Sequence, residues 1–254
     1  MSMNQSVLIC DQVNPVLNEI LEKNGLQITY EPEITPEQIL EKIENFEVII
    51  VRSRTKITKD MIEKANKCQI IARVGVGLDN IDQAAAKEKN IRVINAVEGA
   101  MNAVAELVIG LMLSLAREIP RADREVRNGN WIKKELMGTE LRGKYLGIVG
   151  LGNIGKRLGR LARALNMNII GYDVVPIDEE FSSEVGLMKA DLGTLLASSD
   201  YVSLHVPLLD STKHLINAEK MSTMKNTSRI INTSRGGVID EDALYEFLKD
   251  GKLG

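Results

Sequence analysis

The sequence is poor in the residues that build disulfides, metal sites and large aromatic surfaces. Its 254 residues include 2 cysteines, 2 histidines and 1 tryptophan, and aromatic residues make up 4% of the chain. Cys10 and Cys68 lie far apart and form no Cys-x-x-Cys pair, so we expect two buried thiols and neither a disulfide nor a metal site. Such thiols are typical of a reducing compartment, which predicts a cytoplasmic protein.

An excess of charge of one sign is missing too, because 35 Asp and Glu oppose 32 Lys and Arg and leave a net charge of −3. Without a basic field, nucleic acid is not an expected partner. The N-terminus has no basic region followed by an apolar one, so no signal peptide is expected. The longest apolar stretch, residues 103–116, is short for a membrane span and contains Glu106, so no membrane partner is expected either.

Short apolar runs alternate with helical patterns along most of the chain. In its first part, runs typical of strands occupy residues 7–10, 27–30, 48–51, 69–72 and 91–94. The same alternation returns after residue 144, and it predicts parallel sheets covered by helices, the α/β class. We expect two Rossmann-like or flavodoxin-like lobes, residues 1–99 and 100–254, with the chain crossing between them near residues 95–100.

A segment between the two alternating regions has a different pattern. Residues 102–118 predict a long helix that is apolar on most of its surface and is stopped by Pro120. A charged helix is expected over residues 121–127, followed by an arm that contains Trp131 but has no core of its own. Two interpretations stay open for this arm: a subunit contact, or a surface loop with Trp131 folded back inside.

Residues 144–173 carry the most specific motif. An apolar run of strand type is followed by Gly-Leu-Gly-Asn-Ile-Gly at residues 150–155, a helical stretch, a second apolar run and Asp173. This order is the dinucleotide-binding fingerprint. An ordinary glycine turn of another α/β fold is the alternative, and it is disfavoured because the whole context of the fingerprint is present in one unit.

Each residue of the fingerprint has an expected physical role. Gly150 permits the tight turn, Gly152 lets the main chain approach a pyrophosphate, and Gly155 lets the helix pack closely on the strand. The N–H groups at the start of the helix offer the positive end of its dipole to the phosphates. Asp173 would accept hydrogen bonds from both ribose hydroxyls and would repel a 2′-phosphate, which predicts NAD as the cofactor in preference to NADP.

Other turns follow predicted strands and are expected near this one. Residues 205–207 and 233–237 follow strands of the second lobe, and Arg52 and Gly75 follow strands of the first. Because ligands of parallel sheets bind beyond the carboxyl ends of the strands, we expect the site to be walled by these turns in a cleft between the lobes.

Taken together, these motifs resemble the D-isomer-specific 2-hydroxyacid dehydrogenases, along essentially the whole chain. The residues that carry the resemblance are 51–53, 73–80, 105–107, 137–141, 150–155 with Asp173, 205–208 and 232–237. Within the family, the likeness is strongest to members that oxidise D-3-phosphoglycerate to 3-phosphohydroxypyruvate, the reaction that leads into serine biosynthesis. The resemblance therefore implies an oxidoreductase with a substrate lobe over residues 1–99 and an NAD-binding Rossmann lobe over residues 100–254.

The resemblance also implies roles for single residues. Arg235 corresponds to the catalytic arginine, whose guanidinium would hold the substrate's carboxylate and carbonyl oxygen; the alternative is an ion pair on the surface. The substrate-binding residues would be Arg52, Ser53, Gly75 and Val76, with Arg52 and Ser53 at the phosphate. The cofactor-binding residues would be Val76, Gly150, Gly152, Asn153, Ile154, Gly155, Asp173, His205, Val206, Pro207, Thr233, Ser234 and Arg235. Lys133 or Lys134 of a neighbouring subunit would reach the phosphate, or else form a solvated face.

Some expectations concern what the resemblance leaves open. The family's catalytic Glu and His would follow residue 254, which predicts a C-terminally truncated chain that lacks the last strands of the second sheet. His205 corresponds to a cofactor-lining position and not to that base, and His214 is expected on the surface. Family likeness suggests a homodimer through the NAD-binding lobe. The alternatives are a glyoxylate, hydroxypyruvate or lactate reductase of the same family, or a non-catalytic, corepressor-like NAD-binding protein.

Overall fold

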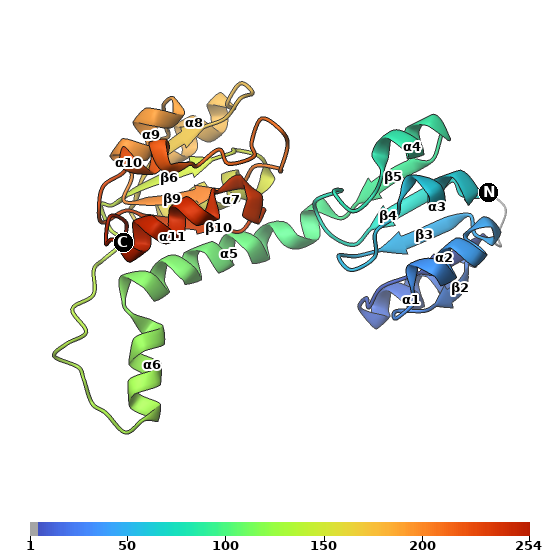
Figure 1. Ribbon diagram of the computed structural model, residues 1–254, viewed down its shortest axis with the longest axis horizontal. Helices are drawn as coiled ribbons and strands as arrows, with labels where there is room; N and C mark the ends of the chain where they lie inside the picture. Colours follow the sequence, from blue (N-terminus) through green and yellow to red (C-terminus); the bar gives the residue numbers. More distant parts are fainter. Residues whose placement is uncertain (1–4) are drawn as a thin grey trace. The chain divides into compact units, whose positions relative to one another are not determined.

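The computed structural model describes residues 5–254, which form two compact units. The first unit ends at Ala100 and the second comprises Met101–Gly254, and in Figure 1 each contains a sheet flanked by helices. Both sheets are five-stranded and all their strand pairs are parallel, which confirms the predicted α/β class with parallel sheets.

The first unit has the strand order β2-β1-β3-β4-β5, which is the flavodoxin-like order. Its strands are β1 (Ser6–Ile9), β2 (Gln27–Tyr30), β3 (Val48–Val51), β4 (Ile70–Arg73) and β5 (Arg92–Asn95). The helices that connect them are α1 (Pro15–Lys23), α2 (Pro36–Lys42) with the 3-10 turn η1 (Ile43–Asn45), α3 (Lys59–Lys64) and α4 (Gln83–Glu88).

Local signals in the sequence account for the start of α2. The Thr35 hydroxyl accepts from the Gln38 amide at 3.3 Å, and the Gln38 side chain accepts from the Thr35 amide at 3.0 Å, which together form a capping box. Pro36 takes the first turn, where its missing N–H costs nothing. The helix ends at Lys42, where the chain tightens into the 3-10 turn η1.

The core of the first unit lies on both faces of its sheet. Val7 and Ile9 of β1 contribute to the cluster on one face, and Leu8 between them contributes to the other, all with no exposed surface. Each such side chain contributes roughly 1.5–3 kcal/mol relative to exposure. Burial on both faces explains why these strands read as continuous apolar runs.

The second unit has the strand order β10-β9-β6-β7-β8. Its strands are β6 (Tyr145–Val149), β7 (Asn168–Tyr172), β8 (Met188–Lys189), β9 (Tyr201–Leu204) and β10 (Arg229–Asn232). The helices around them are α7 (Asn153–Ala164), α8 (Glu179–Val185), α9 (Leu192–Ser198), α10 (Ala218–Ser222), the 3-10 turn η2 (Gly236–Val238) and α11 (Glu241–Lys249). The sequence did not predict α8 or β8, because neither has an apolar run of useful length.

Helix α5 (Val97–Ala116) covers one face of the second sheet and begins at Val97, earlier than the expected residue 102. Ala105, Val108, Met112 and Ala116 are its buried residues, and they join the cluster around β6 and α7. By length and composition, α5 is long and apolar enough to cross a membrane, with a mean hydropathy of 1.7 over its best window. The expectation that no stretch reaches that length was therefore wrong, although a buried core helix passes the same test.

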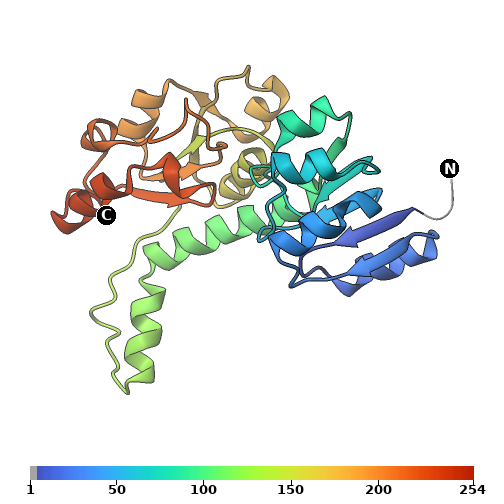
Figure 2. The ribbon, with the colours of Figure 1, turned by 45° about the vertical axis from the view of Figure 1, so that its right-hand side comes forward.

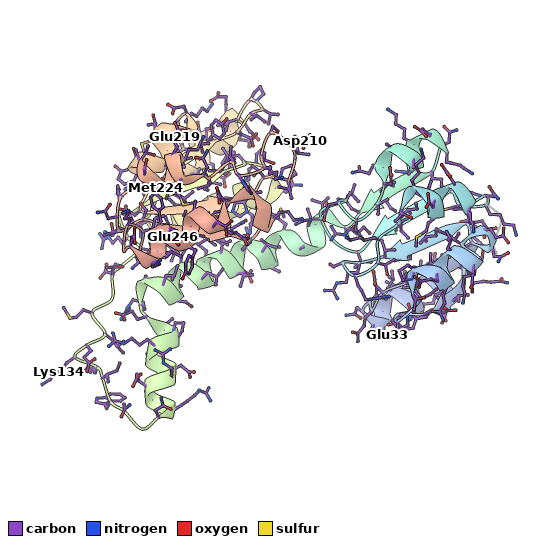
Figure 3. The ribbon with its side chains drawn as sticks, viewed as in Figure 1. Glu33, Lys134, Asp210, Glu219, Met224 and Glu246 are labelled. Atoms are coloured by element: carbon purple, nitrogen blue, oxygen red, sulfur yellow. The ribbon has the colours of Figure 1, made fainter. Side chains whose placement is uncertain are left out.

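Helix α6 (Ile119–Arg127) and the arm after it add no buried side chain up to residue 140. Figure 2 shows them extending away from the sheet of the second unit. Trp131 is 81% exposed and Met137 is 83% exposed, so the interpretation that Trp131 folds back inside was wrong. In Figure 3 the side chain of Lys134 points outward from this arm.

Candidate cofactor and substrate site

The carboxyl ends of the four longer strands of the second sheet lie side by side. Val149 pairs with Tyr172 on one side and with Leu204 on the other, and Leu204 pairs with Asn232. The loops that leave these strands therefore start at one edge of the sheet. Because β6 is flanked by β7 and β9, the chain changes direction across the sheet here, and this is where α/β proteins bind ligands.

The turn from β6 into α7 has a shape that its glycines make possible. Gly150 has φ +93°, and a side chain there would come within 2.7 Å of the His205 carbonyl oxygen. A Cβ on Gly155 would lie 2.1 Å from the Gly150 carbonyl oxygen, so helix and strand can approach this closely only with glycine. Gly152 differs, since a Cβ there would meet nothing within 4 Å.

The start of α7 offers main-chain donors toward that open space. Gly152 is the N-cap, and no side chain among residues 5–254 caps the helix. Asn153, Ile154 and Gly155 form the first turn, whose N–H groups have no acceptor within the helix. The helix dipole adds partial positive charge at the same place, so the turn suits an anionic group such as a pyrophosphate.

Asp173 lies directly after β7 and is already tied to the glycine turn. One carboxylate oxygen accepts from the Leu151 amide at 2.6 Å, and the other accepts from the Val175 amide at 3.1 Å. Lone pairs remain on both oxygens, because a carboxylate offers about four acceptor positions. The carboxylate can therefore hold the turn and still accept from the hydroxyls of a bound ribose.

His205 follows β9 and is held in the neutral state. Its amide donates to the Val149 carbonyl at 2.8 Å, and its Nε2 lies 2.9 Å from the Oγ of Ser203, which is fully buried. Burial lowers the pKa of His205 to about 4, so the ring carries no charge at neutral pH. It is followed by Val206 and Pro207, which are partly buried and exposed, respectively.

The loop after β10 forms a hollow of about 610 Å³. Thr233, Ser234 and Arg235 line it together with side chains of α11. The Asn232 side chain shapes the loop, because its Oδ1 accepts from the Ser234 amide at 3.0 Å and its Nδ2 donates to the Arg235 carbonyl at 2.8 Å. The buried Thr233 hydroxyl has no hydrogen-bond partner among residues 5–254, so it is available to a ligand.

In the first unit, the four predicted substrate residues follow adjacent strands. Val51 at the end of β3 pairs with Arg73 at the end of β4, which sets the loop of Arg52 and Ser53 beside that of Gly75 and Val76. The Gly75 amide donates to the Arg73 carbonyl at 2.9 Å, and the Val76 carbonyl accepts from the Asn95 side chain. Arg52 and Ser53 are exposed.

Two buried polar residues at this edge were not assigned a role from the sequence. Asp11 follows β1 and is 2% exposed, and Asn80 is 8% exposed; both contact the loop that contains Arg52. The signal that could have found Asp11 is an acid placed directly after an apolar strand, the same pattern that singled out Asp173. Asn80 carries no comparable signal, because its partners are distant in the sequence.

The comparison with protein families settles which family this arrangement belongs to. Residues 109–254 match the NAD binding domain of the D-isomer specific 2-hydroxyacid dehydrogenases. The chain belongs to this family. Its cofactor is accordingly a nicotinamide dinucleotide, as expected from the glycine turn.

Individual members of the 2-hydroxyacid dehydrogenase family match nearly the whole chain. A D-3-phosphoglycerate dehydrogenase of Methanocaldococcus jannaschii is 45% identical over 248 residues, 97% of this chain and 47% of that protein. A hydroxypyruvate reductase of Thermotoga maritima is 45% identical over 234 residues, 92% of this chain and 75% of that protein. The chain thus spans about half the length of the phosphoglycerate dehydrogenases that it matches.

Solved structures of the family have the same fold. A glyoxylate reductase from Paecilomyes thermophila superimposes with a TM-score of 0.90 at 30% identity, covering 100% of this chain and 80% of that one. An acyclic imino acid reductase in complex with NADPH and D-Arg gives a TM-score of 0.86 at 30% identity, covering 98% and 80%. The open, uncapped turn at Gly152 and the unpartnered Thr233 hydroxyl fit a dinucleotide at the edge of the second sheet.

Proposed function

We propose that this protein is an NAD-dependent dehydrogenase that oxidises D-3-phosphoglycerate to 3-phosphohydroxypyruvate, the reaction that leads into serine biosynthesis. The observation that carries the choice of substrate is Arg52. Its guanidinium is exposed at the carboxyl end of the first sheet, and within residues 5–254 it has no hydrogen bond or ion pair. A free arginine beside the Ser53 hydroxyl suits a phosphate, which it can bind through parallel N–H donors.

The cofactor would be held mostly by main chain. The amides at Asn153 and Ile154 would donate to the pyrophosphate, and the space beside Gly152 would let it approach. Asp173 would accept from the adenosine ribose and would repel a 2′-phosphate, so we propose NAD in preference to NADP. Residues 205–207 and the hydroxyls of Thr233 and Ser234 would line the rest of the dinucleotide.

The chain's own groups would orient the substrate for oxidation. Arg235 would hold the carboxylate and the C2 oxygen with its planar guanidinium. Oxidation removes a hydride from C2 and a proton from the C2 hydroxyl; the nicotinamide ring would accept the hydride when the cofactor is bound, and the proton would pass to solvent. His205 is a weak base because burial lowers its pKa to about 4, so we assign it to lining the cofactor and not to taking the proton.

Steady-state kinetics on the purified enzyme, in a form that includes the family's catalytic Glu and His, test this proposal. The expected result is reduction of phosphohydroxypyruvate with NADH at a kcat/KM far above that for hydroxypyruvate, and little activity with NADPH. Arg52→Ala is expected to raise the KM for phosphohydroxypyruvate by about ten- to a hundredfold, the worth of a hydrogen-bonded charge, and to leave hydroxypyruvate unaffected. Equal use of the two acids by the unaltered chain would refute the phosphorylated substrate.

A second candidate is a hydroxypyruvate reductase. The relative from Thermotoga maritima favours it, because it is as similar in sequence as the phosphoglycerate dehydrogenase from Methanocaldococcus jannaschii, at 45% identity. In that case Arg52 would not contact the substrate. The unaltered chain would then prefer the unphosphorylated acid, and Arg52→Ala would leave the KM for hydroxypyruvate unchanged. The same assay therefore separates the two candidates.

We also propose a homodimer in the cytoplasm, formed through the second unit. Leu107, Leu111 and Leu115 recur at every fourth position on α5, and they are 54%, 39% and 43% exposed. Trp131 and Met137 extend the apolar surface onto the arm. Exposed apolar surface of this extent is typical of a subunit interface, and a second copy would carry the matching surface.

Sedimentation analysis of the purified chain tests this dimer. The expected mass is twice that of the chain, and Leu111→Glu is expected to halve it, because a carboxylate would have to be buried in the interface. The control is Leu248→Glu on α11, which is 50% exposed and lies outside the proposed interface, so the dimer should persist. An unaltered chain that stays a monomer at micromolar concentration would refute the interface.

In a dimer, Lys133 and Lys134 of the arm would be available to the partner's substrate phosphate.

A further inference from the structure

The loop after β3 contains two exposed arginines, Arg52 and Arg54, which the sequence alone does not distinguish. The contacts of Arg54 are all within the fold. Its guanidinium donates to main-chain carbonyls of Cys10 at 2.5 Å, Pro32 at 2.8 Å and Ile34 at 3.0 Å. Its Nε also lies 3.2 Å from a carboxylate oxygen of Asp11. The donors of Arg54 are therefore largely occupied, whereas the Arg52 guanidinium donates to no acceptor in the described part of the chain.

Arg52 is fixed through its main chain on both sides. Its amide donates to Asp11 Oδ2 at 2.5 Å. Its carbonyl accepts from Asn80 Nδ2 at 2.9 Å and from Arg73 Nε at 3.1 Å. The backbone of this residue is thus held by three side chains, Asp11 from after β1 and Arg73 and Asn80 from the end of β4 and the loop after it, while its guanidinium stays exposed.

Asp11 is the centre of this arrangement. Besides Arg52, it accepts from the Thr55 amide at 3.3 Å and from the Thr55 hydroxyl at 2.8 Å. A carboxylate that is 2% exposed would be costly to bury without these donors, and Arg54 supplies the opposite charge. Asn80 closes the other side of the loop, because its Nδ2 also donates to the Thr55 carbonyl at 2.7 Å.

We propose that Asp11 and Asn80 are positioning residues for the phosphate-binding arginine, and that Arg54 acts through its ion pair with Asp11 and not by contacting the substrate. This inference rests on the proposed function, because it assumes that Arg52 binds a substrate phosphate. Its physical basis is pre-organisation. A guanidinium whose backbone is already fixed loses less conformational entropy on binding, so the loop geometry decides how much of the charge–charge attraction appears as affinity.

Binding to the full chain without turnover tests the proposal. Calorimetric titration of the NAD-loaded chain uses phosphohydroxypyruvate and, separately, hydroxypyruvate; both acids and the cofactor are oxidised, so no reaction intervenes. We expect Arg52→Ala to weaken binding of the phosphorylated acid by about ten- to a hundredfold. Asp11→Asn and Asn80→Ala are expected to weaken it by about five- to thirtyfold, a cost of 1–2 kcal/mol, with hydroxypyruvate unaffected.

Variants of Arg54 provide the matched control for Arg52. Arg54→Lys keeps a charge beside Asp11 and is expected to retain the preference for the phosphorylated acid, whereas Arg54→Ala is expected to lose it about as far as Asp11→Asn does. Urea unfolding of each variant shows whether it is folded. If Asp11→Asn fails to fold, Asn80→Ala still tests the loop, because Asn80 contacts the carbonyls of Arg52 and Thr55 and not Asp11.

The outcomes separate this inference from the proposed function. An unaltered chain without preference for the phosphorylated acid refutes the proposed substrate, whatever the variants do. A preference that disappears in Arg52→Ala but persists in Asp11→Asn and Asn80→Ala overturns the positioning role alone. Equal weakening of both acids by Asp11→Asn also overturns it, since that result indicates a general structural role. If Arg54→Ala loses the preference for the phosphorylated acid and Asp11→Asn keeps it, Arg54 itself contacts the phosphate.

Discussion

The two units use the same kind of sheet but build the loops at its edge by opposite means. In the second unit, the turn at residues 150–155 depends on missing side chains, because a Cβ at Gly155 would lie 2.1 Å from the Gly150 carbonyl oxygen. In the first unit, the loop after β3 depends on side chains that are present, since Asp11 and Asn80 hold the main chain of Arg52. A site of the first kind is broken by adding atoms, and one of the second kind by removing them.

Gly155→Ala is expected to have the largest effect, because the added methyl group meets rigid main chain. The unfolding free energy should fall by about 3 kcal/mol, as in a strongly overpacked core, and NAD binding should disappear with the shape of the turn. Urea unfolding and calorimetry with NAD measure the two effects. An alanine variant as stable as the unaltered chain would show that helix α7 can move away from β6, and the contrast between the units would be lost.

Gly152→Ala separates binding from stability within the same turn. A Cβ there meets nothing within 4 Å and φ is −69°, so the unfolding free energy should stay within about 0.5 kcal/mol. The methyl group would occupy the space through which the pyrophosphate approaches, and we expect NAD to bind about a hundredfold more weakly, the cost of a lost charge-assisted contact. Undiminished NAD affinity in this variant would mean that the pyrophosphate lies elsewhere.

Asp173→Asn removes charge from the second unit without changing volume. The variant keeps one acceptor oxygen for the Leu151 amide but loses the second acceptor and the negative charge. We expect about a tenfold weaker affinity for NAD and a smaller preference over NADP, because the repulsion of the 2′-phosphate disappears. Dissociation constants for both cofactors, measured by NAD(P)H fluorescence, test this, and an unchanged ratio of the two would contradict it.

The parts of the fold that could be predicted from the sequence are those that local chemistry specifies. Strands β2 and β3 have the expected ends, since each is a short run of a type that favours strands. The order of strand, glycine turn, helix and acid predicted the second unit's edge, because every part of it lies within residues 144–173. The family also followed from motifs of this local kind.

The parts that could not be predicted depend on contacts between distant residues. Arg52 and Arg54 look alike in the sequence. What distinguishes them is that the Arg54 guanidinium donates hydrogen bonds to main-chain carbonyls within residues 10–34. Asp11 meets Arg52 across 41 positions of the chain, a pairing that no local pattern encodes. The exposure of Trp131 likewise depends on whether a core forms near the arm, and the arm has too little apolar sequence to form one.

The last prediction distinguishes the units by pH. Both histidines of the chain, His205 and His214, lie in the second unit, and burial lowers the pKa of His205 from 6.5 to about 4. Between these values the unfolded chain binds a proton that the folded chain does not, so stability is lost as pH falls from about 6.5 toward 4. From pH 7.5 to 5 this amounts to about 1–2 kcal/mol, which His205→Gln should abolish and His214→Gln should not. Hydrogen exchange at the two pH values, corrected for its intrinsic pH dependence, should show the loss in the amides around β9 and not in the first unit. A loss of stability that persists in His205→Gln would instead originate in carboxylates, which occur in both units.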